Sequence, residues 1–143
     1  MRHVEIVRLA ALAAFVCLAA ATPASAHHSF RAQYDPDQPL NMTGVVTKID
    51  WMNPHVYFYI DVHDDKTGAV ESWGFEMGPP HMLQQRGWKR NSMQIGDEVS
   101  VEGTRARDGS LTANARRVTL TATGQVLGAA SSEGQTITTG QPQ

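Results

Sequence analysis

The residues best suited to chemistry in this sequence are histidines, and His27 has a special position among them. It directly follows Ala24-Ser25-Ala26, a small-x-small sequence typical of a signal peptidase cleavage site. Cleavage after Ala26 would give His27 a free α-amine beside its imidazole. These two nitrogens can chelate one metal ion, and a second imidazole would complete a nitrogen-only site of the kind that suits copper.

His55 is the best candidate for that second imidazole, because it opens a predicted strand beside the Asn53-Pro54 turn. His28 is a substitute ligand, whereas His63 and His81 are less well placed. The sequence therefore predicts a copper site built from His27, His55 and His28. The alternative is a solvated pair of histidines at a chain end, with His55 hydrogen-bonded to the Asn53 turn.

A second candidate site is a polar and aromatic strand face between His55 and His63. The even positions of this run are apolar and the odd positions are polar or aromatic, so the two sets point to opposite faces of a strand. The predicted ligand-binding residues are Trp51, Asn53, Tyr57, Tyr59, Asp61 and Glu76. The alternative is that the tyrosines are cross-strand partners covered by the N-terminal arm or the C-terminal tail.

Enzyme motifs are absent from the sequence. It contains no nucleophile elbow, no HExxH motif and no phosphate-binding glycine loop. Glu76 beside His55 or His81 would form an acid–base pair, but any strand-rich domain with five histidines offers such pairs by chance. We therefore predict no catalytic residue and a non-catalytic binding or accessory protein whose ligand is unknown.

Residues 1–26 have the features of a secretory signal peptide. A short basic start with Arg2 and Arg8 precedes an apolar run that is too short to span a bilayer. The only cysteine, Cys17, lies inside this run, so the mature chain has no disulfide and no thiolate ligand. We expect a periplasmic or secreted protein that is not held in a membrane after cleavage.

The charge of the mature chain limits its partners. Without residues 1–26 it has ten Lys and Arg against thirteen Asp and Glu, a net charge of −3. A weakly acidic chain argues against nucleic acid or an anionic membrane as the main partner. The expected partner is a small ligand, a metal ion or another protein.

Hydrophobic alternation predicts five short strands over residues 41–51, 55–63, 70–77, 99–103 and 113–120. A short helix over residues 81–86 separates the third and fourth strands and ends at Gly87. This order predicts an all-β fold with one short helix, an OB-fold-like five-stranded small barrel. Another small β-barrel or a β-sandwich variant is the alternative. An arm over residues 27–40 would precede the barrel domain of residues 41–121, and a flexible tail over 122–143 would follow.

Several short motifs resemble those of one protein family. They are His27-His28-Ser29-Phe30, Trp51-x-Asn53-Pro54-His55, Gly78-Pro79-Pro80, Arg86-x-Trp88 and Gly96-Asp97. Together they resemble a family of small exported bacterial proteins of unknown function, over roughly residues 27–120. The resemblance implies an exported OB-like domain and supplies no catalytic residue.

Overall fold

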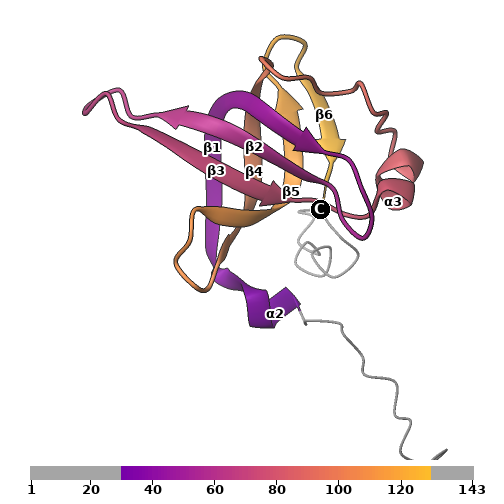
Figure 1. The fold of residues 1–143 in the computed structure, drawn as a ribbon, viewed down its shortest axis with the longest axis horizontal. Coiled ribbons are helices and arrows are strands. Elements are labelled where there is room, and N and C mark those ends of the chain that lie inside the picture. The colour runs from indigo at the N-terminus through magenta and orange to yellow at the C-terminus, as the bar shows by residue number, and fades with distance from the viewer. Residues whose placement is uncertain (1–29, 130–143) are drawn as a thin grey trace, which may run out of the picture.

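The computed structural model describes residues 30–129, most of which form strands (Figure 1). Residues 1–29, with the predicted signal peptide, His27 and His28, and residues 130–143 lie outside the described part. In chain order the elements are α2 (Phe30–Gln33), β1 (Tyr34–Asp50), β2 (Tyr57–His63), β3 (Val70–Glu76), α3 (Pro80–Gln85), β4 (Glu98–Ala106), β5 (Thr112–Leu120) and β6 (Gln125–Gly128). Within residues 30–129, no helix is long and apolar enough to cross a membrane.

The strands form one sheet in the order β3-β2-β1-β4-β5-β6, and five of them close into a ring. The first half of β1 pairs with β4 and its second half with β2. A short parallel pairing between β3 and β5, from Gly74↔Thr112 to Glu76↔Asn114, closes the ring. This arrangement confirms the predicted OB-fold-like, mostly β fold, with α3 as the predicted short helix.

The core forms because apolar residues of facing strands point into the ring. Phe58 and Phe75 are cross-strand partners whose rings stack with centroids 5.2 Å apart, and both are fully buried. Trp88, after α3, is 2 % exposed, and its indole N–H donates to the Gly128 carbonyl at 2.9 Å. Trp73 and Trp88 are therefore core residues, and Trp51 is partly buried and packs against the core.

Gly44 lies where β1 passes from its pairing with β4 to its pairing with β2. A Cβ atom at Gly44 would lie 2.5 Å from the backbone carbonyl oxygen of Asp61, closer than real Cβ atoms approach. The sequence predicts a bend or bulge at Gly44. The bulge itself lies just beyond, between Val46 and Lys48, where the register with β2 shifts.

Two predicted boundaries differ from the structure. The predicted arm over residues 27–40 contains α2 and the first residues of β1, since Tyr34 is buried and pairs with Ala106 of β4. The predicted tail from residue 122 contains β6, a sixth strand that pairs with β5. Leu127 of β6 is 7 % exposed and joins the core. A single buried residue in a four-residue strand leaves no alternation that a sequence pattern can reveal.

We expect Gly44→Ala to destabilise the fold, because the added methyl group meets a backbone oxygen that cannot move without opening the β1–β2 pairing. Overpacking of this kind costs about 1–3 kcal/mol. Urea unfolding followed by circular dichroism measures the loss. Gly128→Ala is the matched control, because its Cβ atom would only contact the Arg86 side chain at 3.9 Å. Equal stabilities of the two variants would contradict this account of Gly44.

Candidate functional site

The candidate site is built around the carboxylate of Glu76, the last residue of β3. This side chain is almost fully buried, with a residue exposure of 6 %. The Tyr34 hydroxyl donates to its Oε2 at 2.5 Å, and His55 Nδ1 contacts its Oε1. A buried carboxylate is stable only when it is paired and hydrogen-bonded, and here each oxygen has its own partner.

Tyr57 is a third residue at this carboxylate. It is the cross-strand partner of Glu76, so both side chains lie on the outer face of the β2–β3 pair. Burial, together with the nearby Glu76 carboxylate, raises the pKa of Tyr57 to about 12. The phenol is therefore held in its neutral form, in which its hydroxyl can donate to the acid.

Tyr34 reaches Glu76 from the first residue of β1, at the end of α2. Burial and the hydrogen bond to Glu76 both raise the pKa of Tyr34 above its ordinary value. Arg107, in the β4–β5 turn, holds this part of the chain in place. Its Nε donates to the Arg31 carbonyl at 2.8 Å, and its guanidinium pairs with Asp35 at 3.1 Å.

Backbone hydrogen bonds bring His55 to Glu76 although His55 lies in the β1–β2 loop. The next residue, Val56, donates its N–H to the Gly78 carbonyl at 3.3 Å and accepts from the Met77 N–H at 2.8 Å. These bonds extend the β2–β3 pairing by one step beyond Glu76. His55 is therefore fixed beside the end of β3, rather than bonded to the Asn53 turn as the alternative interpretation held.

The contact with Glu76 determines what His55 can do. Its Nδ1 is engaged with the carboxylate, while its side chain is still 34 % exposed. Nε2 is then the ring nitrogen left for a ligand. A histidine oriented by a carboxylate in this way is a common metal ligand and a common proton acceptor, because the acid fixes the orientation of the ring.

The other predicted ligand-binding residues lie around this cluster or apart from it. Tyr59 and Asp61 are on the same outer face as Tyr57 but further along β2, opposite Gly74 and Ser72. The Lys48 ammonium lies 5.0 Å from the centroid of the Tyr59 ring, a cation–π distance. The structure thus brings His55, Tyr57 and Glu76 into one cluster and places Tyr59 and Asp61 beyond it.

Trp51 and Asn53 belong to the β1–β2 loop. Asn53 is exposed at the surface. The indole N–H of Trp51 is buried and has no hydrogen-bond partner within residues 30–129. The predicted metal ligands His27 and His28 lie outside the described residues. In the described part of the chain, no three His, Cys, Asp or Glu side chains form a group that could hold a metal ion.

Sequence reasoning missed Asn114 and the role of Tyr34 at this site. Asn114 pairs with Glu76 across β3 and β5, is 3 % exposed, and its Nδ2 has no partner among the described residues. Tyr34 belongs to the predicted arm over residues 27–40, which was not expected to reach Glu76. These residues are 38 and 42 positions from Glu76, so only strand pairing reveals that they meet. A polar residue between Ala113 and Ala115 is the one signal that Asn114 offers.

A surface hollow of about 530 Å³ lies beside Tyr34. Its lining comes from α2 and from the chain around the β4–β5 turn, and consists of Ala32, Gln33, Ala106, Arg107, Asp108 and Thr112. Asp108 is close enough to Tyr34 to contribute to its raised pKa. The hollow is therefore next to Tyr34 through its neighbour Gln33 and its strand partner Ala106. We call Tyr34, His55, Tyr57 and Glu76 the Glu76 cluster.

We expect the free energy of unfolding to fall at alkaline pH because of Tyr57 in the Glu76 cluster. An unfolded tyrosine has a pKa of about 10, and that of Tyr57 is raised to about 12 in the folded chain. The contribution of neutral Tyr57 to the stability of the fold is therefore complete below pH 10 and is lost as the pH rises towards 12. Tyr57→Phe should remove the tyrosinate absorbance step near pH 12 and flatten the fall in stability between pH 10 and 12. An unchanged step would contradict the assignment, and Tyr59→Phe is the matched control.

No curated protein matches the chain. It is similar in fold to the mitochondrial single-stranded DNA-binding protein Rim1 of S. cerevisiae, at 12 % identity and a TM-score of 0.47, covering 59 % of this chain and 93 % of that one. That likeness concerns the fold alone. The model of a family of unknown function, DUF6152, matches residues 14–115, which is most of the chain. This protein belongs to the DUF6152 family.

Proposed function

We propose that this protein is a small exported binding or accessory module whose ligand site is the outer face of β2 and β3 around the Glu76 cluster. One observation supports this proposal above all others. A buried carboxylate gathers Tyr34, His55 and Tyr57 from three separate elements and fixes a partly exposed imidazole at the surface. OB-type folds bind their ligands across the same pair of strands.

The chemistry of this face favours a small ligand with hydroxyl groups and a flat apolar side. Tyr57 and Tyr59 provide half-buried rings, and Asp61 and His55 provide acceptors and a donor along one strand. Beside Glu76, the buried Nδ2 of Asn114 has no hydrogen-bond partner among residues 30–129. Pockets that recognise small molecules combine aromatic walls with a few fixed polar groups in the same manner.

We expect a panel of sugars and hydroxylated aromatic compounds to contain ligands for this face. In amide NMR spectra of the mature protein, binding should shift residues of β2 and β3 around Tyr57 and Glu76. His55→Ala should weaken such binding about tenfold or more, the loss expected when a group in a polar site is removed. His63→Ala, at the exposed end of the same strand, is the control. Shifts confined to other strands would refute this location of the site.

A specific observation also favours a copper site as a second function. His55 has its Nδ1 on a carboxylate and its Nε2 available, the arrangement in which histidines bind metals. The Phe30 ring lies 5.3 Å from the Tyr34 ring, and Tyr34 bonds the same carboxylate. His27 precedes Phe30 by three residues, a reach of about 10 Å. We therefore propose His27 as the second ligand beside His55.

We expect mature protein that begins at His27 to bind copper(II) with a stoichiometry of one, measured by titration and electron paramagnetic resonance. One extra alanine before His27 should weaken binding strongly, because it moves the α-amine. Glu76→Gln should weaken it about 10- to 100-fold, the usual effect of losing the acid behind a ligand histidine. The mass of protein recovered from a periplasmic extract tests the start at His27. Binding that is indifferent to the extra alanine would exclude this site.

A further inference from the structure

The acidic residues of this chain are distributed very unevenly. Residues 77–96 and residues 109–129 contain no aspartate or glutamate at all. The first stretch covers α3 and the loop after it, and the second covers β5 and β6. Both stretches contain basic residues, so their charge differs in sign from that of the whole protein.

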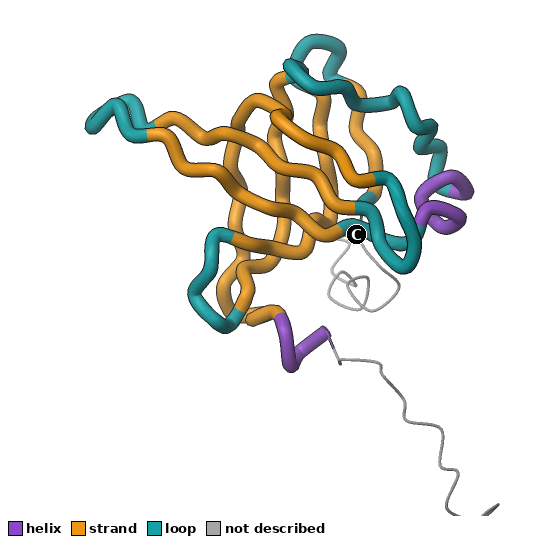
Figure 2. Tube along the Cα trace, viewed as in Figure 1, coloured by secondary structure: helices purple, strands orange, loops and turns teal. Residues whose placement is uncertain are grey.

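The fold places these two acid-free stretches side by side. The indole of Trp88 donates to the Gly128 carbonyl at 2.9 Å, and the Gly78 N–H donates to the Ala129 carbonyl at 2.9 Å. Figure 2 shows the loop that follows α3 running past β6. These contacts bring the basic residues of the two stretches to neighbouring parts of the fold. We call this set of cations the arginine face: Arg86, Lys89, Arg90, Arg116 and Arg117.

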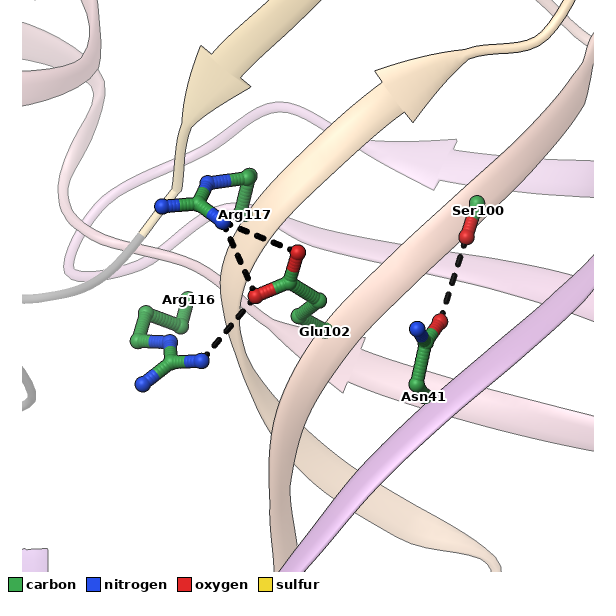
Figure 3. A network of polar contacts seen from close by, with 5 residues as sticks. All are labelled: Asn41, Ser100, Glu102, Arg116 and Arg117. Carbon is green, nitrogen blue, oxygen red and sulfur yellow. Dashed lines mark hydrogen bonds and ion pairs between the residues drawn. The ribbon is translucent and has the colours of Figure 1, made fainter.

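A β-bulge in β5 brings two of these arginines to the same side. The register between β4 and β5 shifts between Glu102 and Gly103, so consecutive residues of β5 no longer point to opposite faces. As a result, Arg116 and Arg117 both reach the Glu102 carboxylate, at 3.0 Å and 2.9 Å (Figure 3). Hydrogen bonds from the two guanidinium groups outweigh burial and lower the pKa of Glu102.

The loop after α3 contributes its cations next to this pair. Gly128 is the cross-strand partner of Arg117, and a Cβ atom at Gly128 would lie 3.9 Å from Cδ of Arg86. Arg86 therefore lies over β6 on the side to which Arg117 points. Lys89 and Arg90, which follow Trp88, are both exposed.

The charges on this face do not balance. Among the described residues, five cations of the arginine face oppose one acid, Glu102, whereas the rest of residues 30–129 has five cations and eleven acids. Residues 130–143 contain one further acid, Glu133. Even if Glu133 pairs with this face, an excess of three positive charges remains. The β2–β3 hairpin, with Asp64 and Asp65 at its turn, projects at the end of the molecule away from α3 (Figure 1).

We propose that the arginine face is a docking surface for an acidic segment of a partner protein, recognised through aspartate and glutamate carboxylates. Four of its five cations are arginines, whose planar fork matches the two oxygens of a carboxylate. Arg117 already donates from a single nitrogen, Nη1, to both oxygens of Glu102, at 2.9 and 3.1 Å, so the face already binds one carboxylate. Arg116 and Arg117 remain 43 % and 49 % exposed, which leaves further N–H groups open to a partner.

The test uses the full mature chain and poly-L-glutamate as the carboxylate probe. We expect saturable binding that weakens as salt is raised, because exposed charges beyond about 8–10 Å are screened at physiological ionic strength. Amide NMR shifts should map to the loop after α3 and to β5 and β6. Lys89→Glu with Arg90→Glu should reduce the affinity at least about fivefold, since charge reversal at an exposed rim acts mainly on electrostatic attraction.

The matched control is Lys48→Glu with Lys66→Glu, which changes the net charge equally at exposed positions outside the face. Arg116→Gln with Arg117→Gln tests the β5 half of the face without adding negative charge. The proposal would be overturned if the control pair lost as much affinity for polyglutamate as Lys89→Glu with Arg90→Glu. Amide NMR shifts that map to β2 and β3 would also overturn it. Stronger binding to single-stranded DNA or to phosphatidylglycerol vesicles than to polyglutamate would also overturn it, in favour of a phosphate partner.

Discussion

The pairing of the buried Glu76 carboxylate is the interaction on which the rest of this site depends. Glu76 sits where β3 ends, where β5 begins to pair with it, and where the β1–β2 loop passes. A carboxylate at 6 % exposure would strongly destabilise the fold if it were unpaired. Tyr34, His55 and Tyr57 meet that requirement from three different elements. The arm, the loop and the sheet are therefore fixed to one another by a single acid.

The strand ring provides the rigid support for this cluster. Phe58 and Phe75 stack inside the ring directly beside Tyr57 and Glu76, which point outward. Tight packing of the inner residues fixes the positions of their neighbours on the outer face. Close backbone approach also supports the cluster at Gly103, where a Cβ atom would clash with the Asn114 carbonyl oxygen. Close approach of β4 and β5 at this glycine positions Asn114 beside the carboxylate.

The fold also separates two surfaces of different character. The β2–β3 side presents tyrosines, a histidine and acids, and the side of α3, β5 and β6 presents arginines. A net charge of −2 for the whole chain conceals this separation, because the acidic segment 97–108 lies between the two acid-free stretches in sequence and they meet only in the folded ring. Long-range attraction follows local charge more closely than net charge. One small domain can therefore offer a ligand site and a docking surface without overlap between them.

The sequence by itself determined the succession of strands along the chain, the short helix, the inward-facing residues and the polar face that includes Tyr57 and Glu76. These features follow from local rules, since alternation has a period of two and Gly and Pro mark the turns. Only the tertiary structure decided that Tyr34 and Asn114 meet Glu76, that β6 adds a sixth strand, and that five cations share one surface. Each of these depends on pairing between segments more than thirty residues apart or on a backbone contact that side-chain patterns do not encode.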